Sequence, residues 1–459
     1  MNGKQFIRGR GCVWCLRLLE PLSEGQFHRY FVVCLVLLIA ATGLKRSALG
    51  QGIPKGARDA AEQMLQAIAS DIRKQYYDPA LHGLDWEARV ADTKKNIEKS
   101  SSYDIALAKI AEAIDGLNDS HTFMLPPVRN FRYSYGWKYA MVGDRCFVTR
   151  VRPGSDAEAK GLHPGDQVVS IDGYSPERAS LWKAQYLFTS LRPQQELRVD
   201  VVDPGGVKRH LALAAKVRPM PRVSAFEELA NAIRGEESDS YYGRARSVSY
   251  GADLLIVRVP EFAFAVDAVQ GIMDKAREHK ALILDLRDNP GGSEETLKFM
   301  VGGLFDHEVK IADRITRSNR KPLVAKPLHH VFGGKLVVLV NSSSSSAAEL
   351  LARVVQLEKR GAIVGDHSAG AVMESKYHDY ELLGVGVRYG AMITEADLIM
   401  TDGKSLEHVG VIPDEAMTPT AADLAAGRDP VLAHAAETLG VKLSADAAGK
   451  LFPYEWAPE

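Results

Sequence analysis

The first regular pattern of hydrophobic and polar positions lies between residues 54 and 127. Apolar residues recur there at intervals of three and four positions, as they do along one face of an α-helix. Three helices are predicted, over residues 57–77, 86–100 and 104–117. Pro126 and Pro127 stop any further helix, because proline lacks the N–H group that a helix interior needs. We therefore expect an N-terminal helical region over residues 54–127.

The pattern changes to short apolar runs separated by turn residues over residues 128–219. Strands are predicted over residues 145–151, 166–173 and 196–213, and the last of these segments contains a Pro-Gly-Gly turn. These residues are expected to form a small β domain, inserted between the helical region and the rest of the chain.

Strands alternate with helices from residue 253 onward. The predicted strands cover residues 253–259, 281–286, 335–340 and 362–365, and the predicted helices between them cover residues 268–280, 294–304 and 347–360. Such alternation indicates a parallel sheet with helical crossovers, so an α/β core is expected over residues 220–459. Active sites of parallel sheets gather beyond the carboxyl ends of the strands.

The first fifty residues contain a single apolar run, at residues 30–44, which basic residues precede and Lys45 and Arg46 follow. This length is typical of a signal peptide and is short for a transmembrane helix. Residues 1–50 are therefore predicted to be a signal peptide or a signal anchor. The protein is expected to be exported, to the periplasm or the extracellular space, with a membrane tether if the segment is retained.

Composition excludes several classes of function. The chain has 57 Lys and Arg residues against 58 Asp and Glu residues, a net charge of -1, so no basic field indicates nucleic-acid binding. Three of the four cysteines precede residue 50, which leaves Cys146 without a partner for an internal disulfide. No set of Cys and His residues has metal-ligand spacing, so we expect neither a metal nor another cofactor.

Five consecutive serines, Ser342 to Ser346, join the predicted strand 335–340 to the predicted helix 347–360. A hydroxyl at a helix N-terminus lies where unpaired N–H groups and the helix dipole favour developing negative charge. An acyl-transfer oxyanion needs that environment. The alternative interpretation is a flexible linker, or serines that only cap the helix.

The loop at residues 285–293 (DLRDNPGGS) is the second chemically suggestive segment. Gly291 and Gly292 stand before a helix, where their backbone N–H groups can face an anion. A tight connection without chemistry is the alternative. Asp285 and Arg287 are expected to brace this loop as an ion pair.

Residues 155–173 (SDAEAKGLHPGDQVVSIDG) resemble a PDZ domain, since they contain the run A-x-x-x-G-L-x-x-G-D-x-(I/V)-x-x-(I/V)-(D/N)-G in full. The resemblance implies binding of extended peptides by strand addition to a sheet edge. The corresponding carboxylate-binding loop would lie near residues 135–141, with Gly136, Trp137, Lys138 and Tyr139 as peptide-binding residues. The loop is not the usual Gly-Leu-Gly-Phe, so a β domain used only for packing is the alternative.

The motif D-x-R-x-N-x-G-G at residues 285–292, followed by S-x-S-x-x-E at residues 344–349, resembles a family of serine peptidases. That family includes the C-terminal processing (tail-specific) proteases and the tricorn core protease. The resemblance implies a ClpP/crotonase-like α/β fold, with Ser346 as the nucleophile. The oxyanion would bind the N–H groups of Ala347 and of Gly291 or Gly292, and Ser344 and Ser345 remain rival nucleophiles.

The chain departs from the processing proteases at Ala371, where their general-base lysine stands. A methyl group cannot accept the serine proton, and an unactivated hydroxyl is a poor nucleophile. The tricorn branch resembles this chain at Ser120-His121 and at Glu407, which implies that His121 is the base and that Ser120 and Glu407 hold its imidazole. The rival bases are His367 and then Lys376.

The sequence therefore predicts an exported, cofactor-free serine endopeptidase that acts on polypeptides, including their C-terminal tails. The family resemblance also allows a homo-oligomer. Two alternatives belong to other classes: an inactive family member that binds peptides or apolar ligands, and a peptide scaffold that acts through the PDZ-like domain alone.

Overall fold

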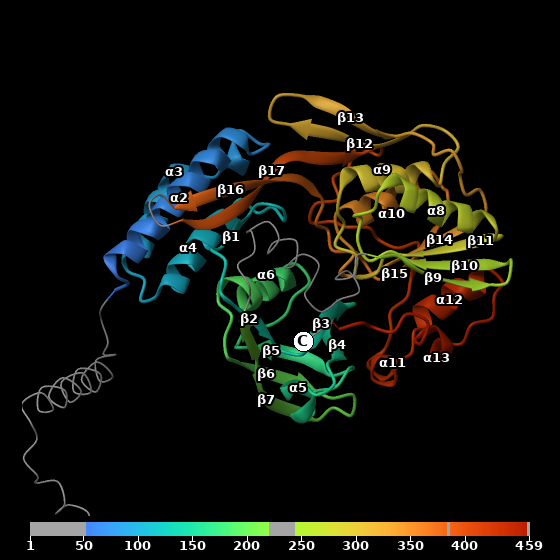
Figure 1. The fold of residues 1–459 in the computed structure, drawn as a ribbon, viewed down its shortest axis with the longest axis horizontal. Coiled ribbons are helices and arrows are strands. Elements are labelled where there is room, and N and C mark those ends of the chain that lie inside the picture. The colour runs from blue at the N-terminus through green and yellow to red at the C-terminus, as the bar shows by residue number, and fades with distance from the viewer. Residues whose placement is uncertain (1–51, 220–243, 383–385, 457–459) are drawn as a thin grey trace, which may run out of the picture. The chain divides into compact units, whose positions relative to one another are not determined.

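Three amphipathic helices begin the described part of the chain, which in this computed structural model comprises residues 52–219, 244–382 and 386–456 (Figure 1). They are α2 (Lys55–Gln75), α3 (Trp86–Glu98) and α4 (Tyr103–Asp115). Asp85 and Ser102 cap α3 and α4 by accepting hydrogen bonds from backbone N–H groups of the first turn. Helix α2 ends before the predicted residue 77, because the chain turns there and the Tyr77 N–H donates to the Thr394 carbonyl.

The predicted signal segment lies outside the described residues. Within the described ranges, no helix is both long and apolar enough to cross a membrane. Residues from Ile53 onward form one compact unit, and the description that follows concerns this unit.

A five-stranded antiparallel sheet of order β3-β4-β5-β6-β7 forms the β domain. Its strands are β3 (Trp137–Val142), β4 (Arg145–Val151), β5 (Gln167–Ile171), β6 (Glu196–Val202) and β7 (Lys208–Ala214). The remaining elements of this region are β2 (Phe131–Ser134), α5 (Asp156–Ala159), α6 (Leu181–Tyr186), η2 (Leu187–Leu191) and β8 (Lys216–Pro219). One prediction is wrong here: residues from Trp137 onward form an edge strand rather than a loop, because Trp137 and Met141 pack into the core of this domain.

The α/β core contains a six-stranded sheet of order β18-β15-β14-β11-β10-β9, in which every pairing is parallel except that of β9 with β10. The strands are β9 (Arg246–Tyr250), β10 (Leu254–Arg258), β11 (Ala281–Asp285), β14 (Lys335–Val340), β15 (Ala362–Gly365) and β18 (Glu415–Ala416). The predicted strand-helix alternation is thus present in this sheet.

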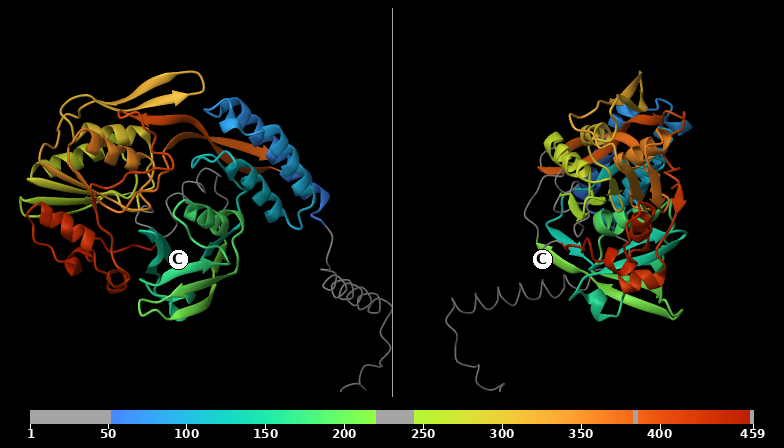
Figure 2. Two further views of the ribbon diagram at one scale, coloured as in Figure 1. Left: turned by 180° about the vertical axis from the view of Figure 1, so that it is seen from behind. Right: turned by 90° about the vertical axis from the view of Figure 1, so that its right-hand side faces the viewer.

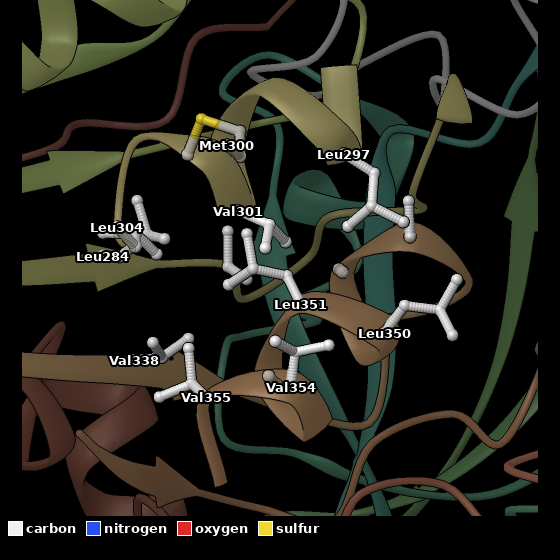
Figure 3. Close-up of a cluster of buried hydrophobic side chains, with 14 of the residues drawn as sticks. Leu284, Leu297, Met300, Val301, Leu304, Val338, Leu350, Leu351, Val354 and Val355 are labelled. Carbon is white, nitrogen blue, oxygen red and sulfur yellow. The ribbon is translucent and has the colours of Figure 1, made fainter. Parts of the chain in front are cut away.

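Helices cover both faces of this sheet, because successive side chains of a strand point to opposite faces. One face packs against α8 (Val266–Arg277), α9 (Glu294–Gly302) and α10 (Ala347–Leu357), and the other against α12 (Pro430–Thr438) and α13 (Ala445–Ala448) (Figure 1). Figure 3 shows Leu351 and Val355 of α10 among side chains of α9 and of the strands. This burial fixes the N-terminus of α10, where the serine run ends.

A second sheet, of order β1-β17-β12-β13 with β16 paired to β17, was not predicted. Its strands are β1 (Phe123–Leu125), β12 (Val309–Thr316), β13 (Arg320–Ala325), β16 (Met373–Leu382) and β17 (Val387–Met400). The hairpin of β16 and β17 reaches the N-terminal helices, and Tyr389 and Ile393 pack in their core (Figure 2). Two further short elements are η1 (Leu81–Gly83) and α11 (Ala421–Ala426).

The predicted fold class is confirmed: an α/β core follows an N-terminal helical region and an inserted PDZ-like β domain. The domain limits at residues 50, 54, 127, 219 and 220 stay predictions.

Candidate active site

Ser346 occupies the turn between β14 and α10 with a φ of 54°. A left-handed backbone is costly for a residue other than glycine, and such strain concentrates at functional sites. Two hydrogen bonds hold the turn: the Ser346 N–H donates to the Ala371 carbonyl (2.8 Å) and to Glu349 Oε2 (3.0 Å). The first residue of α10 is Ala347, so the Ser346 hydroxyl lies at a helix N-terminus.

Gly291 and Gly292 lie against this turn. A Cβ atom on Gly291 would stand 2.7 Å from Ser346 Cβ, and φ is 93° at Gly291 and 141° at Gly292, so only glycine fits without strain. The Gly291 N–H donates to Asn289 Oδ1 (2.8 Å). The N–H groups of Gly292 and Ala347 have no hydrogen-bond partner among the described residues. Of the predicted oxyanion donors, these two N–H groups are therefore the ones left available to a ligand, and Gly291 supplies the close packing.

The other serines of the run differ in what their hydroxyls contact. Ser344 is fully buried; its hydroxyl donates to the Leu286 carbonyl (2.7 Å) and accepts the Asn341 N–H (2.9 Å). Ser342 donates to the Met141 carbonyl (2.5 Å) of the β domain. Ser345 lines a large cavity between the helical region, the β domain and the α/β core, and it stays a rival to Ser346.

Ser120, His121 and Glu407 form a continuous chain of hydrogen bonds. Ser120 Oγ lies 2.7 Å from His121 Nδ1 and 2.9 Å from Glu407 Oε2, and the Ser120 N–H donates to Glu407 Oε1 (2.7 Å). Ser120 has one hydroxyl proton, which it donates to Glu407, so its oxygen accepts the Nδ1–H of His121. The proton-free nitrogen of the imidazole is then Nε2, which is the arrangement that a general base needs.

The surroundings of His121 favour its neutral form. Burial lowers the pKa of His121 below its usual value, while the negative charges of Glu407 and Asp119 act in the opposite direction. A neutral imidazole can accept a proton near neutral pH.

One loop connects the serine turn to the histidine. The Ala371 carbonyl accepts the Ser346 N–H, and the next residue, Val372, donates its N–H to Glu407 Oε2 (2.8 Å). No hydrogen bond between His121 Nε2 and Ser346 Oγ is present among the described residues. The two candidates are thus joined through the backbone of residues 371 and 372 and through Glu407.

Glu349 is a buried carboxylate that sequence reasoning used only to align the motif. It accepts hydrogen bonds from Ser368 Oγ (2.6 Å), Gly370 N (2.7 Å) and Ala371 N (3.0 Å), besides that from Ser346. Burial raises the pKa of Glu349 to about 7, although these donors act to lower it. Its position three residues after Ser346 is the spacing of a capping box, a signal that could have indicated this role.

The rival bases differ in position. His367 lines the same cavity as His121, whereas Lys376 is exposed on β16 and is not among the residues that line the cavity. Asp285 and Arg287 form the predicted ion pair (2.8 Å), and Arg287 also binds Asp429.

A cavity of about 990 Å³ lies between the helical region, the β domain and the α/β core. Its lining includes His121, Ser345, Trp137, Lys138 and Tyr139. Of the predicted peptide-binding residues, Gly136 is buried outside this lining. Ser346 and Gly291 are not among the lining residues, although the residues that precede them in the chain, Ser345 and Pro290, are.

Within the ranges that the structure covers, no group of three or more His, Cys, Asp or Glu side chains is placed to hold a metal ion.

Comparisons with known proteins give matches over the same regions. Residues 253–417 match peptidase family S41, residues 129–200 match the PDZ domain, and residues 57–92 match the tricorn protease C1 domain.

Two curated relatives are processing peptidases. Carboxyl-terminal-processing peptidase 3, chloroplastic, of Arabidopsis thaliana is 24% identical over 361 residues, which are 75% of this chain and 66% of that protein. The C-terminal processing peptidase, chloroplastic, of Tetradesmus obliquus is 25% identical over 414 residues, which are 83% of this chain and 80% of that protein.

Among solved structures, mature CPAF has a TM-score of 0.61 at 16% identity, and the match covers 80% of this chain and 94% of that chain. This likeness is one of fold. The match of residues 253–417 to peptidase family S41, together with the two processing-peptidase relatives, supports a serine-type peptidase, and residues 129–200 match a PDZ domain.

Proposed function

We propose that this protein is a serine endopeptidase that cleaves polypeptides through an acyl-enzyme on Ser346, with His121 as the general base. The observation that carries this proposal is the hydrogen-bond chain from His121 through Ser120 to Glu407, which reaches the Ser346 turn through Val372 and Ala371. Family S41 supplies the reaction class, and this chain has Ala371 where the lysine of the processing proteases stands.

In the first step, Ser346 Oγ attacks the carbonyl carbon of the scissile peptide while its proton passes to His121 Nε2. The negative charge that develops on the carbonyl oxygen is bound by the N–H groups of Gly292 and Ala347. His121 then gives the proton to the leaving amine, which departs and leaves an ester on Ser346. Water, activated by the same base, hydrolyses the ester and restores both residues.

Ser120 and Glu407 orient the base during these steps. The imidazolium that forms in each step has its Nδ1–H directed at Ser120 Oγ, and the Glu407 carboxylate stabilises the positive charge through that hydroxyl. Catalytic hydrogen bonds are often long in unliganded enzymes and tighten when substrate binds. We therefore expect a bound polypeptide to bring His121 Nε2 within reach of Ser346 Oγ.

The cavity supports an extended polypeptide as the substrate. Its lining combines aromatic side chains of the β domain, such as Trp137 and Tyr139, with the Ser345 and His121 region. Strand β3 is the edge of the five-stranded sheet, which is where a PDZ domain pairs with a peptide strand. In this proposal the β domain presents the polypeptide to the serine.

Export of the protein is part of the proposal and rests on the apolar run at residues 30–44. The plant and algal relatives above are chloroplastic by name.

Turnover of fluorescent casein by the full-length protein tests the activity. The wild type should release fluorescent peptides, and Ser346→Ala should release none above background. Ser344→Ala, the matched serine control, should release peptides like the wild type when the rates are compared at the same folded fraction. A folded wild-type protein that binds casein without cleaving it would instead identify a family member that acts by binding.

A further inference from the structure

A buried carboxylate, Asp119, directly precedes the Ser120-His121 pair and has no role in the mechanism above. Its side chain is 5% exposed. Oδ1 accepts the N–H groups of His121 (2.7 Å) and Thr122 (2.8 Å). Oδ2 accepts the hydroxyl of Thr122 (2.8 Å). One side chain therefore fixes the backbone on both sides of the His121 Cα atom.

Asp119 also joins this turn to the long hairpin. The buried Thr394 of β17 donates its hydroxyl to Asp119 Oδ1 (2.9 Å) and its N–H to Thr122 Oγ1 (3.0 Å). The turn that carries the histidine is thus attached to a strand 275 positions away. Because β17 is paired with β16 on one edge and with β1 and β12 on the other, it provides a rigid support.

Asn118, the residue before Asp119, is also held in place by a contact with a distant segment. Asn118 has a left-handed φ of 54°, which asparagine tolerates better than most residues, and its carbonyl lies 2.8 Å from His408 Nε2. His408 follows Glu407, so the segment that orients the imidazole also contacts the start of the turn. Rotation of the His121 backbone would break several of these bonds together.

Asp119 contributes charge as well as geometry. Asp119 and Glu407 are the carboxylates that act on His121. Nearby titratable groups are those of Tyr76, Tyr77 and His408, and further out those of Asp78, His82 and Asp397. Burial and the charge of Asp119 keep the pKa of Tyr76 far above its usual value, so that phenol stays neutral. Loss of the Asp119 charge would therefore lower the pKa of His121 further.

We propose that Asp119 is a positioning residue, which holds the His121 backbone against β17 so that Nε2 faces the serine turn. This inference deepens the proposed function and rests on it. Displacing a catalytic group by about 1 Å can cost a hundredfold in rate. A loss of that kind should appear in the rate of the chemical step and leave the binding of a small probe unchanged.

Labelling of the full-length protein by a fluorophosphonate, measured against probe concentration and pH, tests the inference. Asp119→Asn keeps the size of the side chain and removes its charge, and Thr394→Val replaces the β17 hydroxyl that contacts Asp119 and Thr122 with a methyl group. Both should lower the maximal labelling rate by about tenfold or more without changing the half-saturating probe concentration. Asp119→Asn should also shift the acid limb of the rate to lower pH, and Thr394→Val should leave the limb in place.

The matched control is Asp92→Asn, which changes an exposed aspartate of α3 that pairs with Lys95. This variant should label like the wild type. The inference is overturned if Asp119→Asn, at the same folded fraction, keeps the wild-type maximal rate and acid limb. It is also overturned if its rate falls only in proportion to the unfolded fraction, because Asp119 would then be structural. Failure of the proposed function is distinguishable, since the wild type would then not be labelled at Ser346 or His121→Ala would label at the wild-type rate.

Discussion

Ser120 and Glu407 lie 287 positions apart in the sequence and are joined by two hydrogen bonds, one from the Ser120 N–H (2.7 Å) and one from its hydroxyl (2.9 Å). Glu407 belongs to a loop of the α/β core, and Ser120 follows the last helix of the N-terminal region. The candidate base is therefore assembled from two distant segments, and each can be tested separately.

Glu407→Gln removes the charge that faces the imidazole and keeps a side chain of similar size. We expect the fluorophosphonate labelling rate to fall by about ten- to a hundredfold, because the imidazolium loses its counter-charge. The acid limb of the labelling rate should move to lower pH, since Glu407 raises the pKa of His121. Glu415→Gln, which changes an exposed glutamate of β18 paired with His434, should behave as the wild type. An unchanged acid limb in Glu407→Gln would contradict the assigned contact.

Ser120→Ala breaks the link between His121 Nδ1 and Glu407 and leaves the imidazole tautomer unspecified. The labelling rate should drop by about tenfold or more, and Ser120→Thr, which retains the hydroxyl, should recover most of it. The measurement compares the fluorophosphonate labelling rates of these two variants. Equal rates for the alanine and threonine variants would remove the hydroxyl from the mechanism.

Gly291→Ala places a methyl group 2.7 Å from Ser346 Cβ at a φ of 93°. We expect a loss of roughly 1–3 kcal/mol in the free energy of unfolding, from backbone strain and overpacking, together with loss of labelling at Ser346. Denaturant unfolding measures the first effect. Gly56→Ala in α2 is the control, because a Cβ atom added there would meet no neighbouring group within 4 Å. It should be neutral or stabilising by up to about 1 kcal/mol. A Gly291→Ala variant as stable and as reactive as the wild type would contradict the packing described above.

Glu349 should make the stability of the protein depend on pH. Its pKa is about 7 in the folded state against an ordinary value of 4.5, so the folded state binds the proton more tightly than the unfolded state. The contribution of Glu349 to the free energy of unfolding is then largest below pH 4.5, and it declines by about 3 kcal/mol as the pH rises through 7.

Glu349→Gln, which cannot ionise, should lose this decline. Denaturant midpoints between pH 4.5 and 8 check the prediction against the wild type. If both proteins show the same slope, another group accounts for it.

The local pattern of the chain was sufficient for the helices and parallel strands that surround the serine turn, because their apolar positions repeat with the helical or strand period. It was insufficient for β12, β13, β16 and β17, whose pairings join segments far apart in the sequence. The contact of Thr394 with Asp119 and that of Glu407 with Ser120 depend on those pairings. The sequence did not predict Glu349 as a buried hydrogen-bond acceptor at the Ser346 turn, because its spacing from Ser346 indicates a helix cap but does not show burial.

A run of five identical serines gives no sequence signal that distinguishes the residue with the unusual backbone conformation. Among Ser342 to Ser346, the left-handed φ belongs to Ser346, and Ser344 has its hydroxyl buried. Alignment of Glu349 with the family motif indicated Ser346, and the backbone geometry now supports that position independently.

The most direct test of the Ser/His mechanism is the site and rate of fluorophosphonate labelling of the full-length protein, with the modified peptide located by mass spectrometry. We predict a single adduct on Ser346, its absence in Ser346→Ala, and a rate about a hundredfold lower in His121→Ala. Lys376→Ala should label at the wild-type rate, because Lys376 is exposed and is not among the residues that line the cavity. A folded wild-type protein that acquires no adduct on Ser346, or a His121→Ala variant labelled as fast as the wild type, would contradict the mechanism.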